Sequence, residues 1–216
     1  MQTVADESFV TYEERLNRDP AWALREGSMH FEEKSAVQLT LQKITKRLAD
    51  LKIPYAVVGA MALYLHGYRR FTEDVDLLVT ADGLKQIHEA LAGLGYVHVF
   101  AGSKKLRDAS TGVQIDFLIV GQYPGDGKPK PVLFPDPSVV SIDIDSVRVS
   151  RLETLVELKL ASGMTSLSRI KDMGDVVEVI KRLKLPREFS SRLNPYVAGK
   201  FLELWDSCAL PEPFES

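Results

Sequence analysis

The sequence has a single cysteine, Cys208, among 216 residues. One thiol can form neither an intrachain disulfide nor a multi-cysteine zinc site, so both are excluded within one chain. Apolar runs long enough to span a bilayer are also lacking, and we expect no membrane partner. The first residues lack a basic segment followed by an apolar run. We therefore expect no secretory signal and a cytoplasmic protein.

The chain also lacks an excess of positive charge. It has 27 Lys and Arg against 30 Asp and Glu, for a net charge of -3, so any RNA contact would need a local basic patch. Lys104, Lys105 and Arg107, in a basic turn predicted over 102–112, are candidates for such a patch. A solvated loop explains these side chains equally well.

What is present is ordinary for a globular protein, with 45% hydrophobic and 26% charged residues. The length suits one domain, or a core with a helical appendage. We predict an α+β fold in three regions: an N-terminal arm (1–34), a core with a small mixed sheet flanked by helices (35–150), and a helical C-terminal region (151–216). A ligand site is expected at the junction near Ser150, because a cleft needs two walls.

Residues 55–79 contain the most informative pattern, which indicates a strand, a tight turn, a short helix, a loop and a second strand. Gly59 lies at the turn. Strand side chains alternate between faces, so Asp74 and Asp76 share one face of the second strand. Two neighbouring carboxylates repel each other, and burial raises the cost. A divalent cation that prefers oxygen ligands, such as Mg²⁺, would relieve this repulsion.

A third carboxylate, Asp116, lies in a strand predicted over 113–120. If this strand pairs beside 74–80, Asp116 completes a three-carboxylate cluster. The Gly59–Ala60 bend opens a helix whose free N–H groups suit a phosphate. The alternative is a solvated edge strand, with Asp116 paired to an arginine. The order of bend, acidic pair and later acid favours the functional interpretation.

These residues resemble the polymerase-β-like nucleotidyltransferase superfamily, in which a strand ending in Gly-Ser or Gly-Gly precedes Asp-x-Asp and a later acidic residue. Gly59, Asp74, Asp76 and Asp116 match that pattern. The H-G-x-x-R-x-T-x-D-x-D order over 66–76 is most similar to minimal bacterial nucleotidyltransferases and to abortive-infection type IV toxins. The resemblance implies Mg²⁺ or Mn²⁺ bound by the three aspartates. It also implies that Asp116 helps to deprotonate an acceptor hydroxyl.

Further roles follow from the same resemblance. It implies triphosphate binding by Gly59, Ala60, Arg70, Thr72 and Lys159, and catalytic roles for Lys159 and Asp172. Four of these residues have an alternative explanation: Arg70 as an exposed surface arginine, Thr72 as a strand-forming residue, Lys159 as a snorkelling side chain, and Asp172, one helical turn from Asp175, as part of a charged surface. Ala60 departs from the pattern, because it keeps the N–H but offers no hydroxyl. His66 is better explained as a helix C-cap than as a base.

The predicted function is metal-dependent transfer of a nucleoside monophosphate from a nucleoside triphosphate to an acceptor hydroxyl. RNA such as tRNA, a protein and a small molecule all remain open as acceptors. A toxin role would favour RNA or protein and add an antitoxin partner. Two alternatives are a catalytically degenerate nucleotide-binding module, suggested by Ala60, and a partner-binding scaffold or antitoxin.

The rest of the chain gives coarser predictions. Helices are expected over 33–51, 83–92 (capped by Asp82), 151–162, 169–184 and 186–208, with a break near Pro195. A short strand is expected over 96–100, and a strand or hairpin over 139–149. In the arm, only one helical turn is expected, over 12–16.

Overall fold

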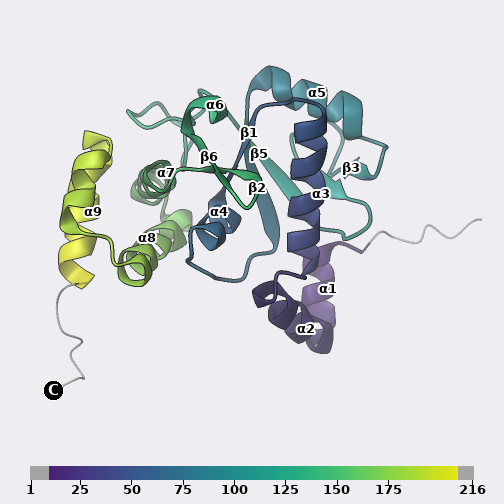
Figure 1. The fold of residues 1–216 in the computed structure, drawn as a ribbon, viewed down its shortest axis with the longest axis horizontal. Coiled ribbons are helices and arrows are strands. Elements are labelled where there is room, and N and C mark those ends of the chain that lie inside the picture. Colours follow the sequence, from purple (N-terminus) through teal and green to yellow (C-terminus); the bar gives the residue numbers. More distant parts are fainter. Residues whose placement is uncertain (1–9, 209–216) are drawn as a thin grey trace, which may run out of the picture.

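The computed structural model describes residues 10–208 (Figure 1). Its centre is a mixed sheet of seven strands in the order β3-β4-β5-β2-β1-β7-β6. The strands are β1 (Tyr55–Val58), β2 (Asp74–Val79), β3 (Tyr96–His98), β4 (Leu106–Asp108), β5 (Gln114–Ile119), β6 (Ser141–Ile144) and β7 (Val147–Ser150). The α+β prediction is confirmed, and so is the hairpin expected over 139–149.

The helices cover both faces of the sheet. On one face lie α3 (Ala36–Asp50) and α5 (Ala81–Leu91), and on the other lie α4 (Gly59–Leu65) and α7 (Leu152–Thr165) (Figure 1). Beyond α7 follow α8 (Ile170–Leu183) and α9 (Pro195–Cys208), and these three helices form the predicted helical C-terminal region as far as residue 208. Three elements of the core and C-terminal region are short: α6 (Pro137–Val140), η1 (Leu167–Arg169) and η2 (Arg187–Arg192).

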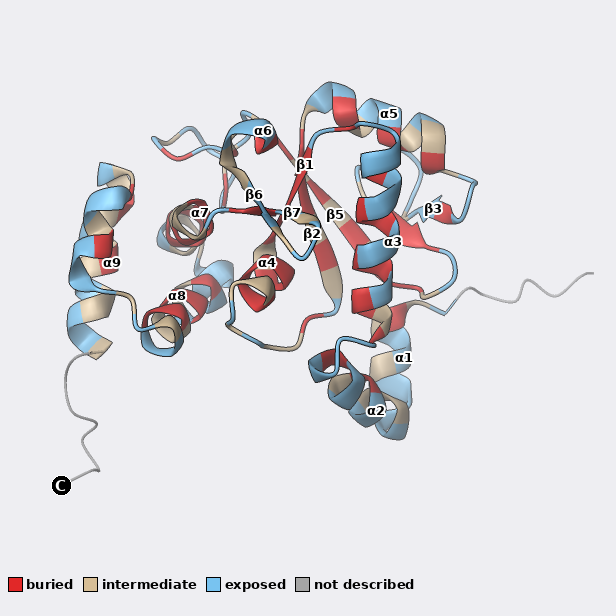
Figure 2. Cartoon of the chain, in the orientation of Figure 1, coloured by how far each residue is buried: buried red, intermediate tan, exposed pale blue. Residues whose placement is uncertain are grey.

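The core forms where the central strands meet these helices. In Figure 2 the buried residues concentrate on β1, β2 and β5 and on the inward faces of the helices. Val75, Leu77 and Val79 are completely buried, and they alternate along β2 with Asp74 and Asp76. One face of β2 therefore anchors the sheet, while its other face is free to present carboxylates.

The N-terminal arm is more ordered than predicted. Besides α1 (Tyr12–Arg18) it contains α2 (Pro20–Phe31), which the sequence pattern did not indicate. Asp19 caps α2 by accepting a hydrogen bond from the Trp22 N–H at 2.9 Å. The buried residues of α2 are Glu26 and His30 rather than aliphatic residues. The usual apolar period of a helix is therefore missing from this segment.

Two local predictions were wrong. Thr80, not Asp82, caps α5, because its hydroxyl accepts a hydrogen bond from the Gly83 N–H at 2.9 Å. The segment 102–112 is not only a turn, since it contains β4. Arg107 on β4 is buried and bonds Glu13 at 2.7 Å, so it does not belong to an exposed basic patch.

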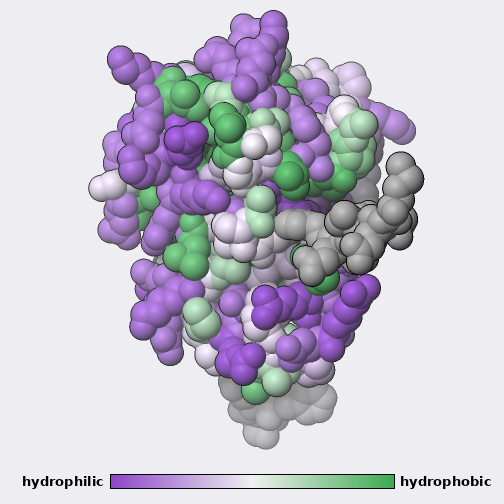
Figure 3. Space-filling view, turned by 90° about the vertical axis from the view of Figure 1, so that its right-hand side faces the viewer, coloured by the Kyte–Doolittle hydropathy of each residue, from purple (hydrophilic) through white to green (hydrophobic). Residues whose placement is uncertain are grey.

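The side of the molecule that carries α3 and β3 is mostly hydrophilic, with hydrophobic side chains interspersed (Figure 3). Leu94 and Phe100, which flank β3 in the sequence, are two of the exposed hydrophobic residues. Within residues 10–208, no helix is both long enough and apolar enough to cross a membrane. The predicted N-terminal arm extends beyond this range, since 1–9 lie outside the described residues.

Candidate active site

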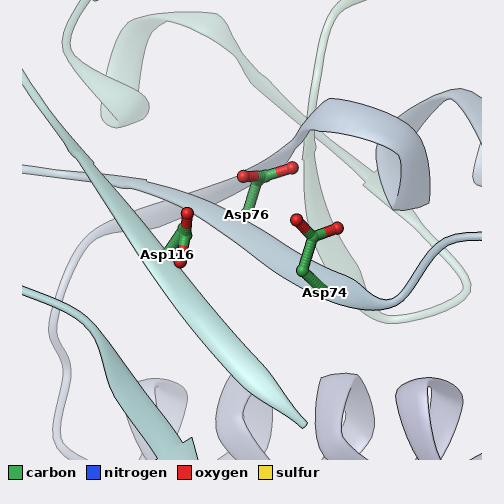
Figure 4. A group of neighbouring side chains, drawn as sticks. All are labelled: Asp74, Asp76 and Asp116. Carbon is green, nitrogen blue, oxygen red and sulfur yellow. The ribbon is translucent and has the colours of Figure 1, made fainter. Parts of the chain in front are cut away.

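Three carboxylates meet on one face of the sheet. The parallel pairing of β2 with β5 places Asp76 directly beside Asp116, and Asp74 lies two residues earlier on the same face. One oxygen from each carboxylate lies within 4.8 Å of the others. Figure 4 shows Asp74 and Asp76 on β2 and Asp116 on the neighbouring strand β5. The predicted convergence of three acidic side chains from two adjoining strands is therefore observed.

The electrostatics of this cluster favour a cation. Burial, followed by the charges of Asp74 and Asp116, raises the pKa of Asp76 from 3.8 to about 7. Lys159 and Arg169 act in the opposite direction and offset only part of this shift. A divalent ion would remove the repulsion that remains, and three carboxylates are the hard oxygen ligands that Mg²⁺ or Mn²⁺ prefers. The donor set therefore fits the predicted metal.

Neighbouring side chains hold the two outer carboxylates in place. The Thr72 hydroxyl donates a hydrogen bond to Asp74 Oδ1 at 2.7 Å. The Gln114 amide donates to Asp116 Oδ1 at 2.7 Å, and Lys105 Nζ lies 2.8 Å from Asp116 Oδ2. Such outer contacts orient the ligands of a metal site. Thr72 thus contacts a carboxylate in this structure, whereas the sequence interpretation predicted that it would contact a phosphate of the triphosphate.

The structure shows a second requirement for glycine at position 59. Its φ is +63°, and a Cβ at this position would lie 1.9 Å from Asp76 Oδ2. The sequence interpretation assigned this glycine to the close approach of a phosphate. In the structure it also makes room for the central carboxylate of the cluster. The same bend begins α4, and Ala60 follows as a buried residue of that helix.

A buried ion-pair network lies beside the cluster. Lys159 on α7 is buried, and its Nζ lies 3.0 Å from Asp172 Oδ1 and 2.6 Å from Asp175 Oδ2. Asp172 also accepts a hydrogen bond from the Ser162 hydroxyl at 2.8 Å. Burial acts to raise the pKa of Asp172, but the Lys159 charge and these hydrogen bonds hold it below the usual value. The buried Lys159 therefore has its counter-ions, Asp172 and Asp175, within the protein.

Arg70 joins the same network from the loop before β2. Its Nε lies 2.8 Å from Asp175 Oδ1, and its Nη2 donates to Asp175 Oδ2 at 3.0 Å. Of these two contacts, the one from Nη2 is a hydrogen bond, while the one from Nε is an ion-pair contact without hydrogen-bond geometry. Together they tie the loop that carries Thr72 to helix α8, and they engage the arginine that the sequence interpretation assigned to a triphosphate.

A cavity of about 430 Å³ connects the cluster and the network, and every candidate site residue named from the sequence lines it. That size is within the range of small-molecule sites. His66, by contrast, is the C-cap residue of α4, and its Nε2 lies 2.8 Å from the Ser150 carbonyl oxygen. The C-cap interpretation of His66 therefore agrees with its position.

Some residues at the site were missed by sequence reasoning. Gln114 could have been found, because it lies two residues before Asp116 and so shares its face of β5. Lys105 was named only for a basic patch, because nothing in the sequence indicated that it would contact Asp116. Arg169, Lys171 and Tyr123 also line the cavity, and they come from segments that were treated as a helix surface or a loop.

Solved structures with a similar fold include three with 18% sequence identity to this chain. A protein described as a candidate nucleotidyltransferase from H. pylori has a TM-score of 0.45, and the match covers 87% of this chain and 93% of that chain. JHP933 from Helicobacter pylori has a TM-score of 0.41, with 79% and 89% covered. An antigenic nucleotidyltransferase-like protein from Paracoccidioides brasiliensis has a TM-score of 0.40, with 68% and 76% covered.

No protein-family model matches the sequence, and no curated protein matches it. At 18% identity and TM-scores below 0.5, these similarities carry no conclusion about the function of this chain.

Proposed function

We propose that this protein is a metal-dependent nucleotidyltransferase, which moves a nucleoside monophosphate from a nucleoside triphosphate to an acceptor hydroxyl and releases pyrophosphate. The observation that carries the proposal is the cluster of Asp74, Asp76 and Asp116, whose oxygens lie within 4.8 Å of one another at a cavity of about 430 Å³. Clustered carboxylates at a cavity are the arrangement that metal-assisted phosphoryl chemistry needs.

The division of labour among the three aspartates follows from their contacts. Mg²⁺ or Mn²⁺ bound to them would neutralise charge on the triphosphate and stabilise the entering and leaving oxygens. Thr72 fixes Asp74, while Gln114 and Lys105 fix Asp116. With Asp116 held in this way, its carboxylate would accept the proton of the acceptor hydroxyl as the new P–O bond forms.

The cations around the cavity would hold the triphosphate. An ammonium group has three N–H donors, and Lys159 uses two of them on Asp172 and Asp175. The third could donate to a phosphate oxygen, with Asp172 serving to orient the lysine. Arg169 and Lys171 line the same cavity. For Arg70, a phosphate contact would be additional to its pairing with Asp175.

The proposed chemistry assigns a role to each region of the chain and implies an acceptor and a partner. The core 35–150 would carry the metal site, and the region 151–216 would supply the opposite wall of the cavity. Gly59, Ala60 and Thr72 would lie at the phosphate end. The acceptor would be an RNA such as tRNA, a protein or a small molecule. An antitoxin partner is expected if the protein acts as a toxin.

One observation favours a second function, that of a nucleotide-binding module without turnover. Ala60 gives the bend beside the cluster a methyl group where a serine hydroxyl could contact the triphosphate. A degenerate site would bind a nucleoside triphosphate but would not release pyrophosphate. Pyrophosphate release therefore separates the two functions.

The test is incubation of the protein with each α-labelled nucleoside triphosphate, Mg²⁺, total RNA and total protein. We expect label on one acceptor class and release of pyrophosphate. Asp74→Ala and Asp76→Ala should lose both, whereas Asp82→Ala, an exposed aspartate on α5, should keep them. Equal labelling by the cluster variants and the wild type would disprove the proposal.

A further inference from the structure

A segment after β5 closes one side of the cavity. Residues 121–131, which we call the strap, leave β5 and reach α7, and the chain that follows them pairs at Phe134 with the beginning of the strap. The Gly121 N–H donates to the Phe134 carbonyl at 2.8 Å, and the Phe134 N–H donates to the Gln122 carbonyl at 2.8 Å. These two bonds fix the base of the strap next to the metal-binding face of the sheet.

The far end of the strap is fixed on α7. Lys130 has a side chain that is only 5% exposed. Its Nζ donates to the Pro124 carbonyl and to Asp126 Oδ1, both at 2.6 Å, and so closes the strap on itself. A lysine that is buried in this way serves the strap rather than a phosphate.

Gly125 lets the strap approach α7 closely. Its φ is +73°, and a Cβ at this position would lie 2.3 Å from Thr165 Oγ1 and 2.8 Å from the Ser162 carbonyl oxygen. Gly127, two residues later, also has a positive φ of +72°, but a Cβ there would meet nothing within 4 Å. The close contact with α7 is therefore specific to Gly125.

Tyr123 lies between these fixed points and lines the cavity. It is half-buried, and its hydroxyl takes part in none of the hydrogen bonds among residues 10–208. Leu118, Pro124 and Phe134 line the cavity beside it. The cavity lining thus combines the acidic aspartates with an apolar and aromatic group contributed by β5, the strap and Phe134. An aromatic ring that is held in place but has no polar partner of its own suits stacking against a flat ligand.

We propose that Tyr123 is the nucleobase platform of the site, on which the base of the nucleoside triphosphate stacks while its phosphates face the aspartates. This inference rests on the proposed function and adds the base-binding end of the same cavity. Stacking is tolerant of base identity, because every base has a π-face. The platform would therefore admit several nucleoside triphosphates and favour them over tripolyphosphate.

The test compares dissociation constants, measured by calorimetry in Mg²⁺, for each nucleoside triphosphate and for inorganic tripolyphosphate. Tyr123→Ala should weaken nucleoside triphosphate binding about 5- to 150-fold, the range of one stacking contact, and leave tripolyphosphate binding unchanged. Tyr123→Phe should bind like the wild type, because the ring remains. Gly125→Ala should weaken nucleoside triphosphate binding as the strap shifts, whereas Gly127→Ala, with similar backbone strain, should not.

The outcomes separate this inference from the proposed function. If the wild type binds a nucleoside triphosphate, Asp74→Ala does not, and Tyr123→Ala binds it normally, the platform is wrong and the metal site stands. Equal loss of tripolyphosphate binding in Tyr123→Ala would also overturn the platform. If the wild type binds no nucleoside triphosphate, both proposals fail.

Discussion

Lys105 Nζ lies 2.8 Å from Asp116 Oδ2, so the lysine that directly precedes β4 already neutralises one member of the carboxylate cluster. A divalent ion that binds Asp116 would have to share this carboxylate with the ammonium group or displace it. The contact is partly exposed, since the Lys105 side chain is 42% accessible. We infer that Lys105 limits metal affinity in the absence of substrate.

Lys105→Met should therefore bind Mg²⁺ more tightly than the wild type. The expected gain is about 3- to 5-fold, since an exposed ion pair is worth at most ~1 kcal/mol. Calorimetric titration of Mg²⁺ into chelator-treated protein measures it. Lys104→Met is the matched control, because Lys104 bonds Gln122 rather than an aspartate. Weaker Mg²⁺ binding by Lys105→Met would show that the lysine supports the metal site instead.

The stability of the metal-free protein should depend on the protonation of Asp76. Its pKa is raised from 3.8 to about 7 in the folded state. A raised folded-state pKa means that stability is greatest below the unfolded value and is lost as the pH rises through 7. The shift sets an upper limit of about 4 kcal/mol on this loss.

Asp76→Asn, which cannot ionise, should remove that loss. Urea unfolding in a chelator should show the smallest stability difference between the variant and the wild type near pH 4, close to the unfolded pKa of 3.8. At pH 8 the variant should be more stable, because the wild type then carries the charge repulsion. Mg²⁺ should stabilise only the wild type at pH 8. A stability difference of the same size at both pH values would contradict the assignment of this repulsion to Asp76.

Lys159→Met should strongly destabilise the protein. The substitution leaves Asp172 and Asp175 buried without the lysine that contacts both of them. Removing one partner of a buried ion pair typically costs ~3–5 kcal/mol. Arg148→Met, which breaks an exposed pair with Asp143, is the control and should change the free energy of unfolding by less than ~1 kcal/mol. Equal effects in urea unfolding would show that the buried network is not a major source of stability.

Gly59→Ala should destroy the metal site. The added Cβ would lie 1.9 Å from Asp76 Oδ2, and the positive φ would be strained as well. We expect loss of Mg²⁺ binding by calorimetry together with a lower melting temperature. Gly174→Ala is the contrasting variant, because Gly174 lies within α8 and a Cβ there meets nothing within 4 Å. That change should stabilise the protein by ~0.5–1 kcal/mol, and normal Mg²⁺ binding by Gly59→Ala would refute the steric argument.

The sequence predicted the centre of the site better than its surroundings. The two strands with Asp74, Asp76 and Asp116 have strong apolar patterns, so their faces could be assigned from alternation alone. The contacts of Lys159 with Asp172 and Asp175 join different helices, and local periodicity says nothing about such pairs. Helix α2 was missed because it buries Glu26 and His30. Its stability comes from tertiary hydrogen bonds, such as that from the Tyr12 hydroxyl to Glu26 at 3.1 Å.

The tertiary contacts of the strap could not be predicted from the local sequence either. Its glycines and prolines indicated a loop, which is correct, but nothing local to 121–131 indicated that Lys130 would be buried or that Gly125 would rest on α7. Thr72 and Arg70 were identified as site residues from their positions in the motif. Their partners in the structure are Asp74 and Asp175. A motif thus located the residues, while only the packed structure reveals what they contact.

Asp76 pairs with Asp116 across the parallel strands β2 and β5, so the metal site can form only when these two strands have the correct register. A shift of β5 by a single residue would turn Asp116 to the opposite face and direct Ile115 or Phe117 toward the cation. Metal ions should therefore select the correctly aligned chain and leave misaligned folding intermediates without this stabilisation. Divalent cations would then improve the yield of refolding as well as support the chemistry.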